Sequence, residues 1–185
     1  LGRYILKELQ SQGHQALAFV RSKQSAKTLN DFQCDIHIGS LASVDEIQKA
    51  LQQVHAVIHA AGGGKANNPE SFFQNNVLPT QNLIAALKHH PVEKFLLVSS
   101  LAAIGPSPAN EPRTNYSAQK PLSPYGESKA QAEMLIQQIK THLHVGIIRP
   151  PTIYGPGDPR LLPMFKAAQK GWAPIPGRRP KTLSL

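Results

Sequence analysis

The sequence predicts an α/β protein built on a doubly wound parallel sheet. Two observations lead to this fold class: short apolar runs recur five times along the 185 residues, and stretches with helical spacing of apolar residues alternate with them. A strand, a helix and a second strand in succession form a right-handed crossover between parallel strands. Repeated alternation therefore favours one parallel sheet with helices on both faces.

The five predicted strands lack polar alternation, which is typical of strands buried on both faces. They are ALAFV (16–20), DIHI (35–38), AVIHA (56–60), KFLLVS (94–99) and HVGIIR (144–149). In a doubly wound sheet, ligands bind beyond the carboxyl ends of the strands. Four of these ends lead into Gly, Ser or basic residues, so we expect the functional site there.

Apolar residues at three- and four-residue spacing predict helices between the strands. The clearest lie in GRYILKELQSQGH (2–14), SVDEIQKALQQ (43–53), ESFFQNNVLPTQNLIAALKHH (70–90) and SPYGESKAQAEMLIQQIKTH (123–142). Pro79 lies inside the third helix and has no N–H to donate, so we expect a kink near Asn75 and Asn76. Such a kink would turn polar groups of Asn76 toward the end of the sheet.

Composition narrows the class of protein. With 41% hydrophobic and 17% charged residues, the chain has the composition of a globular protein. It contains no apolar run of 18 residues and no signal-peptide pattern, so we expect a cytoplasmic location and no membrane partner. The net charge of +9 is densest at GRRPK (177–181), which lacks interleaved aromatics, so no nucleic-acid partner is expected. The single Cys34 excludes an intrachain disulfide, and the histidines lack zinc-helix spacing, so no metal site is expected.

The ends of the chain suggest an incomplete domain. The chain starts at Leu1 and enters an amphipathic helix at once, and it stops at RRPKTLSL, which reads as the approach to a further element. We expect residues 1–157 to form a nucleotide-binding domain truncated at its N-terminus. Residues 158–185 would begin a truncated substrate-binding region.

Tyr125 and Lys129 are the candidate catalytic pair. Residues four apart share a face of a helix, so both side chains can address one ligand. A phenol ordinarily titrates near pH 10, and a neighbouring ammonium favours the phenolate form, which suits proton transfer. Two ordinary helix residues remain the alternative interpretation, but Ser100 follows a predicted buried strand and can hold a substrate carbonyl beside the phenol.

Three segments are candidates for a dinucleotide. Gly2 stands where the last glycine of a phosphate-binding turn would precede the first helix. Arg21 and Ser22 follow the next strand, where an acidic residue would select NAD and an arginine accommodates the 2′-phosphate of NADP, so NADP is favoured and NAD is the alternative. The small residues of HAAGGG (59–64) would permit close approach of a flat ligand, although a flexible loop is an equal interpretation.

Taken together, VIHAAG, NNVLPTQNL, FLLVSSLAAIGP, SPYGESKAQAE and IIRPPTIYGPGD resemble, in order, the landmarks of the extended short-chain dehydrogenase/reductases, specifically the NAD(P)-dependent epimerase/dehydratase family. The resemblance implies a Rossmann fold, an enzyme, Ser100, Tyr125 and Lys129 as catalytic triad, and Asn76 in support. It also implies contacts to the cofactor from Tyr125 and Lys129 and from a set spread over the strand ends: Gly2, Arg21, Ser22, Ala60, Ala61, Gly62, Ser99, Pro150, Pro151 and Thr152.

Three departures from the family pattern affect these expectations. The family's first strand, which is central in the sheet, and two glycines of its turn are absent, so we expect the chain alone to be unstable and to bind cofactor poorly. Ser40 replaces the usual adenine-contacting carboxylate, and we expect most of the substrate domain that follows Gly157 in the family to be missing from this chain.

The loop after Ser100 bears on the reaction. Leu101 and Ala102 replace the acidic pair of the family's dehydratases, and Ile104 precedes GPSP in an apolar loop similar to those of the dihydroflavonol reductase and 3β-hydroxysteroid dehydrogenase groups. We therefore expect hydride transfer to or from a ketone, aldehyde or alcohol group of a fairly apolar small-molecule substrate. A nucleotide-sugar epimerase and a non-catalytic NADP-binding sensor are the alternatives. The family often dimerises through the Tyr/Lys helix, so a homodimer through AQAEMLIQQI (130–139) is open, as is simple core packing.

Overall fold

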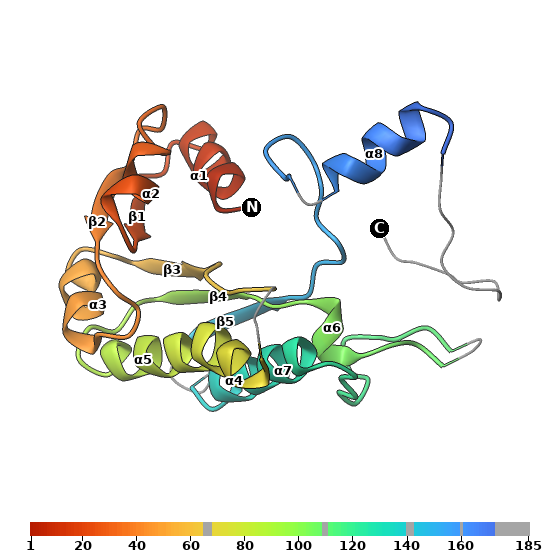
Figure 1. The fold of residues 1–185 in the computed structure, drawn as a ribbon. Coiled ribbons are helices and arrows are strands. Elements are labelled where there is room, and N and C mark those ends of the chain that lie inside the picture. Colours follow the sequence, from red (N-terminus) through yellow and green to blue (C-terminus); the bar gives the residue numbers. More distant parts are fainter. Residues whose placement is uncertain (65–67, 109–110, 140–142, 160, 173–185) are drawn as a thin grey trace. The chain divides into compact units, whose positions relative to one another are not determined.

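The structure is a computed structural model that describes residues 1–64, 68–108, 111–139, 143–159 and 161–172. The chain forms two compact units, Leu1–Arg149 and Pro150–Leu185. All five strands lie in the first unit (Figure 1).

The five predicted strands are confirmed, and every pair among them is parallel. They are β1 (Leu17–Val20), β2 (Asp35–Ile38), β3 (Ala56–His59), β4 (Lys94–Val98) and β5 (His144–Ile148). β1 pairs with β2, with Leu17 opposite Asp35. β4 lies between β3 and β5, and its Lys94 is opposite both Ala56 and His144.

The strands form two sheets, β1-β2 and β3-β4-β5, rather than one. In the doubly wound order 3-2-1-4-5-6, removal of strand 1 leaves strands 2 and 3 paired on one side and strands 4 to 6 on the other. The break between β1 and β3 is thus where the sequence led us to expect a missing central strand. The Rossmann-like fold class is confirmed with this interruption.

The longer predicted helices are also confirmed: α1 (Gly2–Ser11), α3 (Val44–Leu51), α5 (Leu78–Leu87) and α7 (Pro124–Gln137). Hydroxyl caps begin two of them, because Ser43 accepts from Glu46 N and Ser123 accepts from Gly126 N. Three helices were not predicted, namely α2 (Lys23–Lys27), α6 (Leu101–Ile104) and α8 (Leu162–Gln169).

A π-helical turn interrupts the third predicted helix. α4 (Pro69–Phe72) passes into η1 (Phe73–Val77) and then into α5. The irregularity expected near Asn75 and Asn76 is therefore present, and Pro79, in the first turn of α5, lies just after it. Asn76 lies within this turn and is buried.

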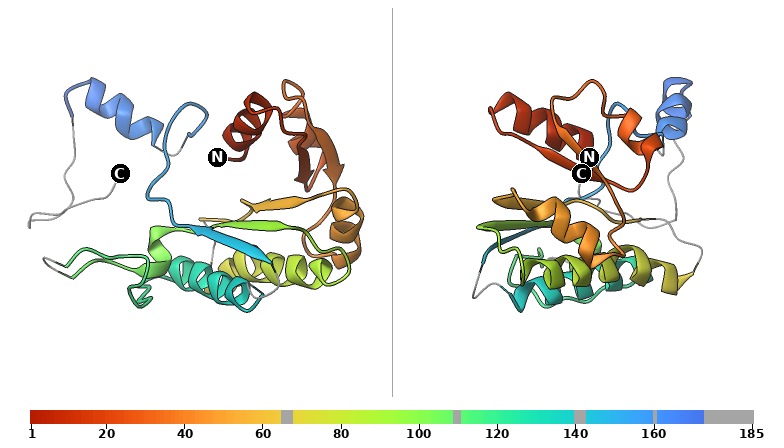
Figure 2. Two further views of the ribbon diagram at one scale, coloured as in Figure 1. Left: turned by 180° about the vertical axis from the view of Figure 1, so that it is seen from behind. Right: turned by 90° about the vertical axis from the view of Figure 1, so that its left-hand side faces the viewer.

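The core of the first unit lies between the β3-β4-β5 sheet and the helices on one of its faces (Figures 1 and 2). Phe95 and Leu97 on β4 meet Ile136 on α7 within it. The buried core cluster comprises Ile47, Leu51, Leu83, Ala86, Leu87, Val92, Phe95, Leu97, Ala132 and Ile136.

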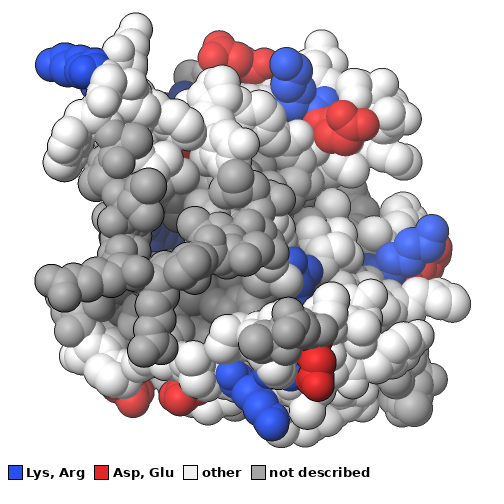
Figure 3. All heavy atoms as spheres, turned by 90° about the vertical axis from the view of Figure 1, so that its right-hand side faces the viewer, with Lys and Arg blue, Asp and Glu red and all other residues white. Residues whose placement is uncertain are grey.

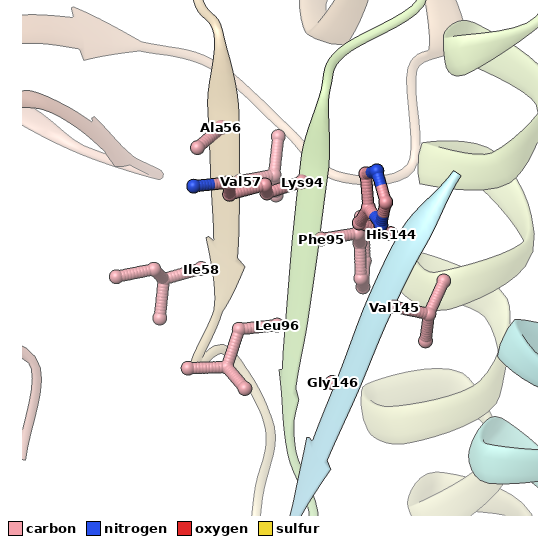
Figure 4. A pocket seen from close by; sticks show the side chains of 9 residues that line it. All are labelled: Ala56, Val57, Ile58, Lys94, Phe95, Leu96, His144, Val145 and Gly146. Carbon is pink, nitrogen blue, oxygen red and sulfur yellow. The ribbon is translucent and has the colours of Figure 1, made fainter. Parts of the chain in front are cut away.

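The expectation that the strands are buried on both faces is wrong for the described unit. Ile58 is 37% exposed and Ile148 is 46% exposed. Figure 4 shows Ile58 and Leu96 on the side of the sheet away from the helices, where a shallow hollow runs across the three strands. Ala56, Val57, Ile58, Lys94, Phe95, Leu96, His144, Val145 and Gly146 line this hollow. The reason is that α5 and α7 cover one face only.

Charged residues on the face in Figure 3 do not gather into one basic patch: the described Lys and Arg side chains stand apart, several with Asp or Glu nearby. GRRPK (177–181), the densest basic stretch of the sequence, lies outside the described residues. In the second unit, the ring of Tyr154 contacts Phe165 of α8 at 5.8 Å between centroids.

Candidate active site

Helix α7 carries the two residues of the candidate catalytic pair in its first two turns. Ser123 caps the helix by accepting a hydrogen bond from Gly126 N at 3.1 Å, and Pro124 occupies the first turn, where its missing N–H costs nothing. Tyr125 is half-buried and Lys129 is only 4% exposed. A buried ammonium requires partners, so its contacts identify its role.

The Lys129 ammonium is held at the end of β4. Its Nζ donates to the carbonyl oxygen of Val98 at 2.8 Å. Burial lowers the pKa of Lys129, and the negative charge of Glu133, one turn further along α7, opposes that effect. The ammonium therefore lies beside the strand end that leads directly to Ser99 and Ser100.

Ser100 begins helix α6 as its N-cap. Its Oγ accepts from Ala102 N at 3.2 Å, and the hydroxyl keeps its own proton for donation. α6 packs tightly against α7, because a Cβ at Gly126 would lie 2.4 Å from the carbonyl oxygen of Ala102. This close approach brings the elements carrying Ser100 and Tyr125 together.

Asn76 connects the end of β3 with α7. Its side chain accepts from Gly63 N at 2.9 Å and donates to Gly63 O at 3.2 Å and to Ser128 Oγ at 2.9 Å. A Cβ at Gly62 would lie 2.7 Å from Asn76 Oδ1 and 3.6 Å from Lys129 Nζ. The glycine loop after β3 thus lies against the predicted lysine and asparagine, and a side chain at residue 62 would collide with Asn76.

Apolar side chains lie next to Tyr125 and after Ser100. The ring of Phe72 contacts that of Tyr125 at 5.9 Å between centroids. Ile104 is buried, and Leu101 and Ala102 are half-buried. Leu101 and Ala102, which directly follow Ser100 on α6, have no group that can exchange a proton in elimination chemistry.

The predicted residues therefore divide into two sets. Ser100, Tyr125, Lys129, Asn76 and the 60–62 loop lie on elements that contact one another around the ends of β3 and β4. Ser99, directly after β4, belongs with this first set, because its hydroxyl donates to Glu133 on α7. Gly2, Arg21 and Ser22 lie on other elements, around α1 and the end of β1.

Arg21 is exposed at the end of β1, and Ser22 accepts from Ser25 N as the cap of α2. Gly2 is exposed at the start of α1, where a Cβ would meet nothing within 4 Å. Pro150, Pro151 and Thr152 fall in the second unit. The cofactor roles of these residues stay predictions.

A buried polar network behind the pair was not predicted. Glu133 is fully buried and accepts from Ser99 and Gln119, and it forms a bidentate pair with Arg149, with Nη2 to Oε2 at 2.7 Å. The hydrogen bond from Arg149 to Glu133 raises the pKa of that guanidinium further. The signal in the sequence was a glutamate eight residues after Tyr125, on the helix face of Tyr125 and Lys129.

Another buried titratable group lies behind the site. His59, the last residue of β3, is 4% exposed, and its Nε2 lies 3.1 Å from Thr80 Oγ1. Burial, and secondarily the charge of Lys129, lowers the pKa of His59 to about 3. The imidazole is therefore neutral at physiological pH.

Comparison with known proteins bears on this arrangement. The family model for the NAD dependent epimerase/dehydratase family matches residues 1–176. The chain is 29% identical over 178 residues to a human sterol-4-alpha-carboxylate 3-dehydrogenase, decarboxylating, covering 92% of the chain and 47% of the human protein. It is 31% identical over 189 residues to the 3 beta-hydroxysteroid dehydrogenase/Delta 5→4-isomerase of vaccinia virus strain Ankara, covering 89% of the chain and 52% of the viral protein.

A third relative is the ceramide reductase of Caulobacter vibrioides, 29% identical over 170 residues, with 92% of the chain and 48% of that protein covered. Among solved structures, MoeE5 in complex with UDP-glucuronic acid and NAD is 26% identical, with a TM-score of 0.78 over 90% of the chain and 57% of MoeE5. The Thermus thermophilus UDP-glucose 4-epimerase complex with NAD has a TM-score of 0.82 at 22% identity, over 92% of the chain and 60% of the epimerase, which shows the fold alone.

The chain spans about half the length of the curated relatives it matches. Among the helices of the described residues, none combines the length and apolar character that crossing a membrane requires. The match over residues 1–176, with Tyr125, Lys129 and Ser100 on adjoining elements, leads to one conclusion. The chain belongs to the NAD dependent epimerase/dehydratase family.

Proposed function

We propose that this protein is an NADP(H)-dependent oxidoreductase that transfers a hydride to or from a ketone, aldehyde or alcohol, with Tyr125 as general acid and base. The observation that carries the proposal is the hydrogen bond from Lys129 Nζ to Val98 O at 2.8 Å. It holds a buried ammonium, four residues from Tyr125, at the strand end that leads to Ser100. A lysine that only covered the surface of the helix would remain exposed, because burial of its charge is costly.

The chain's residues fit a dinucleotide at the ends of β3 and β4. The 61–62 backbone is exposed, and a side chain at residue 62 would collide with Asn76. Lys129 supplies a cation beside this loop for a ribose hydroxyl. When bound, the nicotinamide would supply or accept the hydride.

Ser100 and Tyr125 would act on the oxygen of the substrate. In reduction, the Ser100 hydroxyl donates a hydrogen bond to the carbonyl oxygen, and the Tyr125 phenol gives that oxygen its proton as the carbonyl carbon becomes an alcohol carbon. The Lys129 ammonium stabilises the phenolate that remains. In oxidation, the same groups act in reverse, and the phenolate takes the alcohol proton.

Residues next to the candidate site support an apolar substrate. Phe72 packs beside Tyr125, and the half-buried Leu101 directly follows Ser100 on α6. The relatives named sterol-4-alpha-carboxylate 3-dehydrogenase, 3 beta-hydroxysteroid dehydrogenase and ceramide reductase support this substrate class. We propose a carbonyl or alcohol carried by a bulky, mainly apolar molecule.

Arg21 supports NADP over NAD. Arg21 and Lys23 are exposed just after β1, and no acidic residue stands among residues 21–27. Two exposed cations at this strand end suit a 2′-phosphate, whereas a carboxylate would suit the free ribose hydroxyl of NAD. Isothermal titration with NADPH and NADH tests the choice: NADPH should bind more tightly, and Arg21→Ala should remove the difference. Equal or tighter binding of NADH would show that this reading of Arg21 is wrong.

The proposal is tested by Tyr125→Phe and Lys129→Met in the complete protein, assayed for substrate-dependent NADPH oxidation with a panel of apolar ketones. General acid–base catalysis contributes about 10²- to 10⁴-fold, so Tyr125→Phe should lose about that much of kcat. Tyr116→Phe is the matched control, because Tyr116 is 97% exposed. Full turnover in Tyr125→Phe would refute both the reductase and the epimerase readings and favour a non-catalytic NADP-binding protein.

A nucleotide-sugar epimerase is the second candidate. The similarity to MoeE5, solved with UDP-glucuronic acid and NAD, at 26% identity and a TM-score of 0.78 favours it. An epimerase returns the hydride to the substrate, so it shows sugar interconversion without net oxidation of cofactor. Net NADPH consumption with an apolar ketone supports the reductase instead.

A further inference from the structure

Glu133 is the most enclosed charged residue among those described. Its side chain is 0% exposed, and every buried side-chain nitrogen or oxygen of the described residues has a hydrogen-bond partner. Arg149 donates to both carboxylate oxygens, with Nε to Oε1 at 3.0 Å, Nε to Oε2 at 3.1 Å and Nη2 to Oε2 at 2.7 Å. The Ser99 hydroxyl and the Gln119 amide donate to the same carboxylate.

These partners come from three different segments around the candidate active site. Ser99 directly follows β4 and precedes Ser100, and Arg149 directly follows β5. Gln119 lies in the loop that leads into α7, and Glu133 itself stands one turn after Lys129. One carboxylate therefore joins the ends of two strands to the helix that carries the lysine.

Fold stability alone does not require a charge here. A buried ion pair is often replaced by well-packed apolar residues without loss of stability, because desolvation offsets the attraction between the charges. Ala132 and Ile136, on the same helix, show that apolar side chains pack against this sheet. A charged group at residue 133 is thus better explained by what it does to its neighbours.

We propose that Glu133 is a positioning residue of the active site: its carboxylate fixes Ser99, and hence Ser100, against α7 and keeps a negative charge beside the Lys129 ammonium. This inference rests on the proposed function, because it assigns Glu133 a task only if Ser100 and Lys129 act as described there.

The charged and titratable groups that face Lys129 define the expected effect. Tyr125 and Glu133 lie on its own helix, His59 faces it from β3, and Arg149 acts from the end of β5 through Glu133. β4 presents the Val98 carbonyl, and η1 presents the uncharged Asn76. With His59 neutral, Glu133 supplies the negative charge that favours the ammonium.

The Glu133→Gln substitution removes the charge at constant size, and its amide oxygen can still accept from Ser99 and Arg149. Without the negative charge of residue 133, the Lys129 ammonium loses its proton at lower pH. The alkaline limb of the pH profile of kcat/KM should therefore shift to lower pH by about one pH unit. Arg149→Gln removes the neighbouring positive charge and should move the limb the opposite way. Glu127→Gln is the matched control, since Glu127 is an exposed acid on the same helix, and its profile should match that of the wild type.

General destabilisation of the fold would not shift the pH profiles of the two variants in opposite directions. Opposite shifts therefore cannot come from it. A Glu133→Gln enzyme with a lower melting temperature but an unmoved pH profile would overturn the inference and leave Glu133 a structural residue. If Glu133→Gln does not fold, the Arg149→Gln profile decides in the same way. Tyr125→Phe is assayed in parallel: if it keeps full turnover, the proposed function and this inference both fail, whereas an inactive Tyr125→Phe with an unmoved Glu133→Gln profile overturns this inference alone.

Discussion

Acidification should destabilise this protein through His59. The Thr80 hydroxyl has one proton and donates it to Asn76 O at 2.8 Å, so His59 Nε2 carries the proton that bridges His59 to Thr80 at 3.1 Å. Its ring also meets Phe95 edge-on, at 6.3 Å between centroids. A second proton would place a charge in this apolar surrounding, near the Lys129 ammonium, which is why the pKa of His59 falls to about 3.

The sign and size of the effect follow from proton linkage. The unfolded chain binds a proton at His59 below pH 6.5, whereas the folded protein does so only below about pH 3, so stability falls as pH drops between these values. Integration of this difference gives a loss of about 2 kcal/mol between pH 8 and pH 5, and about 4 kcal/mol by pH 3. The full loss approaches the total stability of a typical domain.

Urea unfolding followed by circular dichroism at pH 8 and pH 5 measures the loss, which corresponds to a fall of about 1 M in the midpoint. His59→Leu removes the titrating ring and should flatten the dependence by that amount, whereas His14→Leu, at an exposed position, should leave it unchanged. If wild type and His59→Leu lose the same stability between the two pH values, the reasoning about His59 is refuted.

Three further predictions concern the contacts of the site. Gly126→Ala should lower the free energy of unfolding by about 1–3 kcal/mol despite the better helix propensity of alanine, because its Cβ would lie 2.4 Å from Ala102 O; a more stable variant in urea titration would contradict this. Gly62→Ala should weaken NADPH binding in calorimetry through its collision with Asn76 Oδ1, while Gly64→Ala, which meets nothing within 4 Å, should bind as the wild type does; equal losses would rule out the collision. Asn76→Ala should destabilise the protein by about 1–3 kcal/mol by removing the partner of Gly63 N, with exposed Asn75→Ala as control, and equal melting temperatures for the two variants would count against it.

The strands and long helices were predictable because their signal is local. Runs such as FLLV and the three- and four-residue spacing of α3, α5 and α7 reflect burial on one face, and the structure places Phe95, Leu97 and Ile136 in one core. α2 and α6, of five and four residues, are too short to carry a periodic pattern. The split of the sheet agrees with the strand order of a doubly wound fold that lacks its first strand. The exposure of Ile58 and Ile148, in contrast, could not be derived from their apolar character.

The candidate site was predictable where spacing along one helix determines contact. Helical periodicity placed Tyr125 and Lys129 on one helix, and the preceding apolar run placed Ser100 after a buried strand. Their catalytic roles stay predictions that rest on the family resemblance. Ser128 and Arg149 were not found, because their partners lie 52 and 16 residues away in the sequence. Contacts over such separations depend on how strands and helices pack, which a single sequence does not specify.

The sequence of helix α7 nevertheless contained a pattern that supports its proposed catalytic role. Tyr125, Lys129 and Glu133 recur at four-residue spacing, while Ala132 and Ile136 show that the inner side of this helix packs into the core. A surface helix ordinarily turns its charges toward water, so a row of polar residues along the buried side requires partners inside the protein. The structure supplies them from the ends of β4 and β5: Val98 O for the lysine, and Ser99 and Arg149 for the glutamate. A polar row on the buried side of a helix that lines the strand ends is therefore better grounds for a catalytic reading than the Tyr–Lys spacing alone.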